Sequence, residues 1–365
     1  MEPVFRSFPD AWPAILDDVR ACSADFQINL VLNVQGETIV ARNYEGFSIE
    51  ANFMTPTDLS DYVEALRKSG FFVRVFLDEV EFIRAVLAKD LHSGHHRYNF
   101  TYCPAINSIG AGRRAFMPGF CNHFQLPTLN NNPYSATIGR HKHHCAKLLR
   151  CLGFPTPETW LYQTDGLWLD NTGPEVGQKV IVKPSYECSS IGVGGSGSTQ
   201  YSEETKDRLA LLSAGLSQPI TVQSFVPGDE FEVVVLELDG EFAATPVAVI
   251  DKDGLISGER TLDYQKVRTE AYGYVSVESD HPQVSEMSDI ARNTAKALGF
   301  VGISRVDMRL DSVGYPLIFD VSSTPDLTRM SSCAQVFNAL GMTYNDLWLF
   351  AVASSFLRHR TDGNC

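Results

Sequence analysis

The segment SRVDMRLDSVGYPLIFDVSSTPDLT, residues 304–328, decides how this chain folds. Apolar and polar residues alternate along residues 305–310 and again along residues 317–322. Such alternation is typical of β-strands that have one core face and one polar face. We therefore predict an antiparallel hairpin. The residues expected on the core face of its second strand are Leu317, Phe319 and Val321.

The polar face of this hairpin carries two carboxylates. With the turn centred on residues 313–314, Asp307 lies directly opposite Asp320. Cross-strand neighbours are about 5 Å apart at Cβ, and like charges at that distance are destabilising unless a cation lies between them. Two carboxylates and the hydroxyl of Ser322 suit Mg²⁺, which completes its shell with water and substrate phosphates. The competing interpretation is a solvated face on which two neighbouring arginines neutralise the acids.

A second segment, VIVKPSYECSSIGVGGSGST at residues 180–199, places Lys183 between a β-branched run and a stretch rich in glycine and serine. Its glycines match G-x-G-x-x-G, but a dinucleotide-binding turn needs its helix to begin inside that fingerprint. Here helical periodicity starts only near Leu209, and no Gly-Lys-Ser/Thr closes a Walker loop. Two interpretations remain: a loop whose N–H groups bind phosphates beside Lys183, and a surface loop with a solvated lysine.

The first third of the chain alternates strand-like runs with helical patterns between residues 26 and 106. This alternation predicts a parallel sheet with crossover helices. Residues 126–133, LPTLNNNP, are loop-like, and we place a domain boundary there. Asp239 and Gly240 lie between two apolar alternating runs, which is typical of a hairpin turn. Single helices are expected at residues 134–152, 203–216, 285–299 and 337–357.

The bulk composition is that of an ordinary globular protein of 365 residues, 44% hydrophobic and 20% charged. The net charge of −14 makes nucleic acid an unfavourable partner, while it leaves a local nucleotide site open. No apolar stretch approaches the length of a membrane helix, so we expect no membrane association. The eight cysteines contain no C-x-x-C pair, which favours reduced thiols and a cytoplasmic location.

Four segments in this order resemble the ATP-grasp ligases, and among them the D-alanine–D-alanine ligases: HKHHCAKLLRCLGFPTP, VIVKPSYECSSIGVG, VQSFVPGDEFEVVVL, and RVDMRLD with PLIFDVSSTPDLTRMSS. The resemblance covers roughly residues 134–332. It implies an α/β chain of the α+β ATP-grasp type. The implied parts are an N-terminal parallel-sheet preATP-grasp domain (1–133), a central subdomain with the phosphate loop (134–221), and a C-terminal subdomain with the metal and acyl-phosphate site (222–365).

The resemblance also implies a nucleotide site. Lys142 and Lys183 match the family's two phosphate-binding lysines, and Glu230 matches its ribose-binding acid. Residues 187–193 match the phosphate loop, which is expected to close over the acyl phosphate. The remaining residues implied to contact ATP are Glu187, Ser189, Ser190, Ile191, Gln223, Ser224, Phe225 and Val226.

The chemistry implied by the resemblance takes place beside the nucleotide. Asp307, Asp320 and Ser322 match the ligands of Mg²⁺, with Mn²⁺ as an alternative ion. Arg305 and the backbone N–H of Asp326 are expected to stabilise the oxyanion, and Ser190 belongs to the closing loop. The groups that match the binding site for the second substrate's carboxylate are Ser331 and either Lys266 or Arg268.

Three departures from the family pattern bear on specificity. Gln223-Ser224 replaces Glu-Lys before the adenine hinge, and Ser322 replaces an asparagine at the metal. Most telling, Pro325-Asp326 stands where the family has Pro-Gly, and an added carboxylate disfavours an anionic acceptor. In the N-terminal third, the glutamate that would hold the first substrate's ammonium is either Glu45 or Glu50.

These features predict an ATP-dependent ligase that joins an amino-acid carboxylate to an amine through an acyl phosphate and releases ADP and phosphate. We expect a specialised amino-acid or dipeptide ligase rather than a cell-wall enzyme, small-molecule substrates, and a homodimer as one assembly. Two alternatives stay open: a non-catalytic nucleotide-binding relative and a dinucleotide-binding oxidoreductase. The histidines of HKHH and HSGHH are interpreted as surface groups or as neighbours of the site, without a transition metal.

Overall fold

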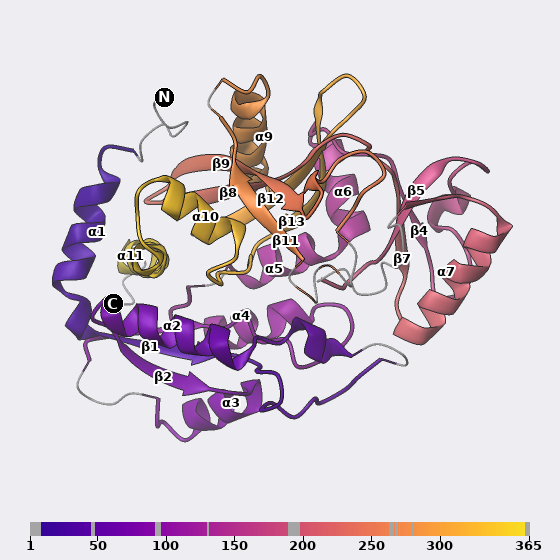
Figure 1. Ribbon diagram of the computed structural model, residues 1–365. Helices are drawn as coiled ribbons and strands as arrows, with labels where there is room; N and C mark the ends of the chain where they lie inside the picture. Colours follow the sequence, from indigo (N-terminus) through magenta and orange to yellow (C-terminus); the bar gives the residue numbers. More distant parts are fainter. Residues whose placement is uncertain are drawn as a thin grey trace.

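Three β-sheets form the framework of the protein (Figure 1). In the computed structural model, no helix within the described residues is long and apolar enough to cross a membrane. The structure describes residues 9–44, 48–91, 96–129, 131–188, 198–262, 266, 269, 271–278 and 280–361.

The N-terminal sheet is parallel, as predicted. Its central strand β1 (Phe26–Val31) pairs with β2 (Phe72–Phe76) on one side and with β3 (Tyr98–Tyr102) on the other. Helix α2 begins after Thr55, because a reciprocal capping box with Asp58 satisfies its first N–H groups. The helices of this region are α1 (Trp12–Ala21), α2 (Pro56–Lys68), α3 (Glu79–Leu87) and α4 (Arg113–His123), with short 3₁₀ turns at Ser23–Asp25 and Ile49–Asn52.

The single helix expected at residues 134–152 is wrong. The structure has two helices, α5 (Pro133–Arg140) and α6 (Lys142–Cys151), separated at His141, whose backbone is not helical (φ −81°, ψ 87°). The N–H of Lys142 donates to the carbonyl of Ser185 (3.2 Å) instead of continuing the first helix. The break therefore ties the start of α6 to the segment that follows β5.

The central sheet is antiparallel, with the strand order β4-β7-β5-β6. Helix α7 (Glu203–Leu216) follows β6 and begins where the side chain of Ser202 caps the N–H of Thr205. The strands are β4 (Thr159–Tyr162), β5 (Lys179–Pro184), β6 (Ser198–Gln200) and β7 (Ile220–Ser224), and a 3₁₀ turn lies at Leu169–Asn171.

The largest sheet has the order β10-β9-β8-β12-β13, and β11 also pairs with β9. The predicted turn at Asp239 and Gly240 joins β8 to β9, and both residues have the positive φ values (55° and 77°) that such a turn requires. Helix α9 (Val284–Ala297) packs on this sheet. The strands are β8 (Glu230–Leu238), β9 (Glu241–Asp251), β10 (Gly254–Leu255), β11 (Tyr272–Ser276), β12 (Ile303–Leu310) and β13 (Pro316–Ser322).

The hairpin of β12 and β13 contains a β-bulge that the sequence analysis missed. Asp307 pairs with Asp320 as predicted, but Met308 pairs with Ile318, so Phe319 is the extra residue. The bulge interrupts the alternation of faces, and Ile318 is buried in the core in place of Phe319. Phe319 instead lines the large cavity described below. The predicted core positions of Leu317 and Phe319 are therefore wrong, whereas that of Val321 is confirmed.

The C-terminal residues form two helices instead of the single one expected at 337–357. Helix α10 (Ser332–Ala339) ends before Gly341, whose positive φ of 73° reverses the chain, and α11 (Tyr344–Thr361) follows. The side chains of Trp348 and Phe350 on α11 are fully buried in the same core as the N-terminal sheet. Helix α11 contacts α1, α2, α10 and β8, and it thereby joins the N-terminal sheet to the largest sheet (Figure 1).

Candidate active site

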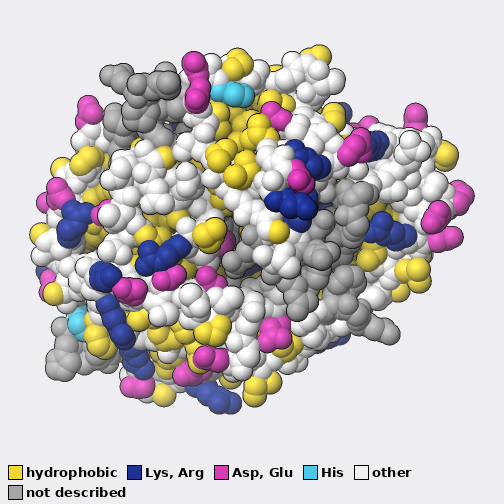
Figure 2. Space-filling model, in the orientation of Figure 1, with side chains coloured by type: hydrophobic (Ala, Val, Ile, Leu, Met, Phe, Trp, Pro, Cys, Tyr) yellow, Lys and Arg dark blue, Asp and Glu magenta, His cyan; other side chains and the backbone are white. Residues whose placement is uncertain are grey.

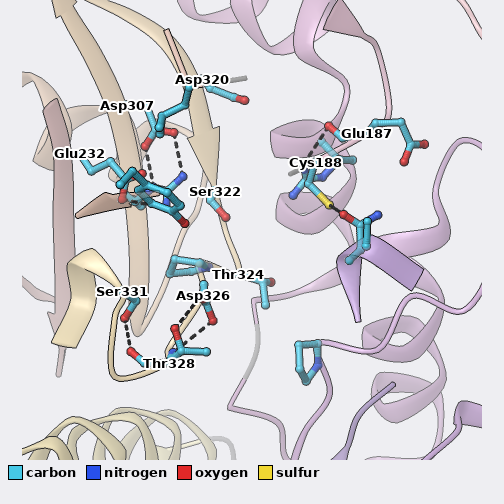
Figure 3. A pocket seen from close by; sticks show the side chains of 18 of the residues that line it. Glu187, Cys188, Glu232, Asp307, Asp320, Ser322, Thr324, Asp326, Thr328 and Ser331 are labelled. Atoms are coloured by element: carbon cyan, nitrogen blue, oxygen red, sulfur yellow. Dashed lines mark hydrogen bonds and ion pairs between the residues drawn. The ribbon is translucent and has the colours of Figure 1, made fainter. Parts of the chain in front are cut away.

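A cavity of about 1110 Å³ lies where the three sheets face one another. Its lining comes from the N-terminal segment 48–62, from residues 181–188 of the central region, and from β12, β13 and the loop at 322–331. In Figure 3, Asp307, Asp320 and Asp326 lie on one side of this cavity, and Glu187 and Cys188 lie on the other. Acidic and basic side chains are interspersed over the coloured part of the face that Figure 2 shows.

The two carboxylates of the hairpin lie side by side and each has a cationic partner. Arg305 binds Asp307 with two hydrogen bonds, from Nε to Oδ1 (2.6 Å) and from Nη2 to Oδ2 (2.9 Å). Lys142 Nζ donates to Asp320 Oδ2 (2.6 Å). Burial raises the pKa of Asp307 against the opposing effect of Arg305. Burial also acts to raise the pKa of Asp320, but Lys142, Lys183 and Arg140 outweigh it and lower that pKa to about 2.

Lys183 projects from the end of β5 into the cavity. Its ammonium donates to Gln223 Oε1 (3.0 Å) and lies 4.6 Å from the centre of the Phe319 ring, so the bulge supplies one of its contacts. Burial lowers the pKa of Lys183 from 10.5 to about 8. The group therefore carries a desolvated positive charge at neutral pH, which an anionic phosphate would stabilise.

The expected adenine and ribose contacts lie together at one end of the cavity, along residues 223–226 and at Glu230. The hydroxyl of Ser224 accepts a hydrogen bond from Gln178 Nε2 (3.1 Å). Glu230 is buried and faces Arg309 across 3.8 Å, and burial raises the pKa of its carboxyl. This end combines apolar surface from Phe225 and Val226 with hydrogen-bonding groups, the usual composition of a nucleotide pocket.

The residues present fit a magnesium ion. Asp307 and Asp320 are directly opposite each other on paired strands, and the Ser322 hydroxyl lies two residues further along. These are oxygen donors, the ligand type that Mg²⁺ prefers. Among the described residues, no group of three or more His, Cys, Asp or Glu side chains is placed to hold a metal. A magnesium ion at the hairpin would therefore use these two carboxylates together with water and the oxygens of the substrate.

Residues 153–350 match the family described as D-ala D-ala ligase C-terminus, which is more than half of the chain. The chain belongs to the D-alanine–D-alanine ligase family. Among curated relatives, the D-alanine–D-alanine ligase of Synechococcus sp. (strain JA-2-3B'a(2-13)) is 26% identical over 246 residues, which are 65% of this chain and 70% of that protein. The enzyme of the same name from Cupriavidus necator is 24% identical over 249 residues, 67% of this chain and 73% of its own.

Solved structures of the same family share the fold. The D-alanine–D-alanine ligase from Bacillus anthracis complexed with ATP has a TM-score of 0.64 at 16% identity and covers 92% of this chain and 99% of its own. The VanG D-Ala:D-Ser ligase from Enterococcus faecalis has a TM-score of 0.63 at 15% identity and covers 90% and 99%. Family membership confirms the predicted ATP-grasp fold, the class of ATP-dependent, ADP-forming carboxylate–amine ligase, and ATP and Mg²⁺ as cofactors.

The ligase site contains most, but not all, of the residues singled out from the sequence. The acceptor-side residues Asp326 and Ser331 line the cavity, and the Ser331 hydroxyl also caps α10 at the N–H of Ala334 (3.2 Å). Lys266 is not among the lining side chains; its Nζ lies 3.0 Å from Asp251 Oδ2. The predicted site residues that lie outside the described part of the chain are Ser189, Ser190, Ile191 and Arg268, together with Glu45.

The structure also gives the contacts of Glu50 and of the histidines in HKHH, which were singled out from the sequence. Glu50 lines the cavity, and its Oε1 accepts from the N–H of Gly36 (3.0 Å). The rings of His141 and His144 stack with centroids 3.7 Å apart, and His141 Nδ1 accepts from the N–H of His144 (3.5 Å) at the start of α6. Burial lowers the pKa of His141 to about 4. His141 therefore caps the start of α6 as a neutral ring.

Sequence reasoning missed several charged groups of the cavity. Glu232 is buried, and its Oε2 lies 2.9 Å from Arg305 Nη1. Burial raises the pKa of Glu232 to about 7, although Arg305 opposes the shift. Its position two residues after Glu230 on the same strand is a signal that could have found it. No local pattern marks Arg114 and Arg140, because tertiary structure alone brings them to the cavity.

Proposed function

We propose that this ligase joins the carboxylate of an amino acid to an amine or another cationic acceptor, and that it is a specialised amino-acid or dipeptide ligase rather than a cell-wall D-alanine–D-alanine ligase. The observation that carries the proposal is Asp326. Its side chain is exposed to the solvent of the cavity in the loop after β13, at the position where the family resemblance has glycine.

Asp326 forms no ion pair with any of the described residues. Its oxygens accept from the N–H of Thr328 (3.1 Å), from the hydroxyl of Thr328 (2.7 Å) and from the hydroxyl of Tyr62 (3.4 Å), all of which are neutral donors. Asp58 and Asp61 line the same cavity, and Arg329 Nε lies 2.8 Å from Asp61 Oδ1. An acceptor carboxylate would meet repulsion here, whereas an ammonium group would be attracted.

Arg305, the cation expected at the acyl centre, is already engaged by two carboxylates. Asp307 holds it with two hydrogen bonds, and Glu232 contacts its third nitrogen at 2.9 Å. This arrangement supports the same proposal, because all three nitrogens of Arg305 already contact carboxyl groups of the protein. Arg305 still has a fixed guanidinium plane with which to polarise an oxygen of the reacting carboxylate.

In the proposed reaction, an oxygen of the donor carboxylate attacks the γ-phosphorus of ATP, and the bond from that phosphorus to the β-phosphate oxygen breaks to release ADP. Lys142 and Lys183 bind the phosphate oxygens and balance their charge. A magnesium ion held by Asp307, Asp320 and Ser322 would neutralise charge on the phosphates. The acceptor nitrogen then attacks the acyl carbon, phosphate leaves with its electron pair, and the nitrogen loses a proton.

The test is a comparison of acceptors. The measurement is release of ADP and phosphate, with mass spectrometry of the product, for amines, amino-acid amides and free amino acids that share a side chain. We expect wild type to prefer acceptors without a carboxylate, and Asp326→Gly to shift the preference toward free amino acids by about tenfold or more in kcat/KM. Asp326→Asn is the matched control, because it keeps the size and removes the charge.

Removal of the charge alone should produce most of the shift, so Asp326→Asn should resemble Asp326→Gly. The proposal is wrong if wild type condenses two D-alanine molecules as well as it uses the corresponding amide.

Three further expectations stay predictions: the domain boundaries at residues 133 and 221, the homodimer and the cytoplasmic location. Light scattering coupled to size-exclusion chromatography measures the assembly directly.

A further inference from the structure

Glu187 and Cys188 lie across the cavity from Asp307 and Asp320 (Figure 3). Three arginines act electrostatically on Cys188: Arg113, Arg114 and Arg140. Only one of the arginines is balanced by a carboxylate. Arg113 Nη2 lies 2.7 Å from Glu187 Oε2, and both side chains are almost completely buried. The other oxygen of Glu187 accepts from the Tyr44 hydroxyl (2.5 Å) and from Gln218 Nε2 (3.1 Å). Glu187 is thus fully engaged in a structural network beneath the cavity wall.

Arg114 and Arg140 line the cavity and have no carboxylate partner among the described residues. Arg114 donates to the carbonyl of Pro104 (3.1 Å) and to Cys188 Sγ (3.5 Å), and Arg140 donates to the carbonyl of Glu187 (3.4 Å). The Nε atoms of both arginines are buried and lack a hydrogen-bond partner in the described structure. Residues 189–197, which follow directly, contain no aspartate or glutamate that could neutralise them.

The titration of nearby groups reflects this excess of positive charge. Burial lowers the pKa of Arg114; Cys188 opposes this shift, and Arg140 and Arg113 add to it. Burial acts to raise the pKa of Cys188, but Arg140, Arg114 and Arg113 outweigh it and lower that pKa to about 7. Even a Cys188 thiolate would leave one of these two arginines without an anion, and a buried guanidinium group without an anion is costly, so this wall of the cavity is suited to an anionic ligand.

We propose that Arg114 and Arg140 bind a second anionic group of the donor acid, a carboxylate or a phosphate, distinct from the carboxylate that is activated. This proposal rests on the proposed ligase function and specifies its donor. Arg114 comes from α4 of the N-terminal region, and Cys188 beside it contacts Asn52 of the segment 48–55 (3.2 Å from Sγ to Oδ1), so the cluster adjoins the N-terminal wall. Lys142 and Lys183, which the proposed reaction assigns to the nucleotide phosphates, contact β13 at Asp320 and at the carbonyl of Phe319.

The test uses hydroxylamine as the nucleophile, because it traps any acyl phosphate as a hydroxamate whatever the natural acceptor is. Donors are compared in matched pairs at saturating Mg-ATP: glutamate with glutamine, aspartate with asparagine, and O-phosphoserine with serine. We expect the anionic member of at least one pair to be preferred by about tenfold or more in kcat/KM. Arg114→Gln and Arg140→Gln should each remove that preference and leave the KM for ATP unchanged.

The matched control is Arg150→Gln, an exposed arginine on α6 outside the cavity lining. Arg114→Lys keeps the charge and should retain part of the preference, which separates loss of charge from loss of folding. Equal use of both members of every pair by wild type overturns the proposal. A rise in the KM for ATP that is the same for all donors in the glutamine variants also overturns it, because the cluster would then serve the nucleotide.

A failure of the proposed ligase function has a different signature, in which ATP binds and no donor yields ADP or hydroxamate. In that case the anion site is tested by calorimetry of glutamate and O-phosphoserine with the protein loaded with a non-hydrolysable ATP analogue. Binding that is lost in Arg114→Gln and kept in Arg150→Gln supports the site without any turnover. An absence of binding by both anions to wild type contradicts it.

Discussion

The two walls of the cavity are built in different ways. On the wall formed by β12 and β13, the pairing of two adjacent strands places Asp307 against Asp320. On the opposite wall, Tyr44, Arg113 and Glu187 meet although they are 69 to 143 residues apart. The first wall depends on local register, which the sequence largely encodes, and the second depends on how distant segments pack.

The difference also divides the chemistry. The hairpin wall carries Asp307 and Asp320, which the family resemblance predicts for the metal, and Arg305, predicted for the acyl centre, whereas Asp326 lies in the loop after β13 and Arg114 and Arg140 lie on the opposite wall. We therefore expect substitutions on the hairpin wall to abolish turnover with every substrate. Substitutions on the other wall should change which substrates are used, or should lower the free energy of unfolding.

The largest effect is expected for Asp307→Asn. The substitution keeps the size of the side chain and removes one of the two carboxylates that face each other across the hairpin. Turnover should fall by roughly 10²–10³-fold, because charge on the phosphates and the acyl centre is no longer balanced. ADP release under saturating substrates measures the change, with Asp289→Asn on the exposed side of α9 as the control. Retention of more than one tenth of the activity would show that this wall is not the catalytic one.

The second prediction concerns pH and Lys183, whose pKa burial lowers to about 8. The ammonium is charged below this pH and loses its proton above it, so affinity for ATP should decline as the pH rises. Between pH 7 and pH 9 the apparent KM for ATP should increase up to about tenfold, since one unit above the pKa leaves about a tenth of the groups charged. Lys183→Arg stays charged over this range and should give a flat profile. The same slope in both proteins would assign the titration to another group.

The sequence predicts features that depend on local register better than features that depend on the packing of distant segments. The parallel N-terminal sheet, the Asp239–Gly240 turn and the opposition of Asp307 and Asp320 were all predicted, because each depends on periodicity or turn chemistry within a short segment. The bulge at Phe319 was not predicted. The turn of the hairpin is one residue longer than expected, and the extra residue Phe319 compensates for it, so that Asp307 still pairs with Asp320. A bulge leaves no signal in an alternating pattern that continues on both sides of it.

The helix breaks and the arginine cluster could not be predicted for a related reason. The break at His141 depends on a hydrogen bond from Lys142 to Ser185, which is 43 residues away. Arg114 and Arg140 come from different helices and meet only because α4 packs on α5. Local propensity is similar for a continuous and a broken helix here, so tertiary contacts decide between them.

The third prediction tests the charge of the opposite wall through Cys188. With a pKa of about 7, its thiol should react with iodoacetamide increasingly from pH 6 to pH 8, because the thiolate is the reactive form. Arg114→Gln should move the midpoint upward and slow labelling at pH 7 several-fold. Mass-spectrometric mapping in a Cys151→Ser background identifies the site, since Cys151 is exposed. Labelling at pH 7 that is equally fast with and without Arg114 would contradict this account of the wall.

The smallest effect is expected for Tyr44→Phe, which removes one hydrogen bond between the N-terminal region and Glu187. Glu187 keeps its ion pair with Arg113 and its bond from Gln218, so its charge is not left unpaired. The free energy of unfolding should therefore fall by only about 1 kcal/mol. Urea denaturation measures it, with Tyr134→Phe, an exposed tyrosine on α5, as the control. If this network holds the wall that carries Arg114, selectivity between anionic and neutral donors should weaken along with stability. A loss of stability with unchanged selectivity would mean that Arg114 is positioned independently of Glu187.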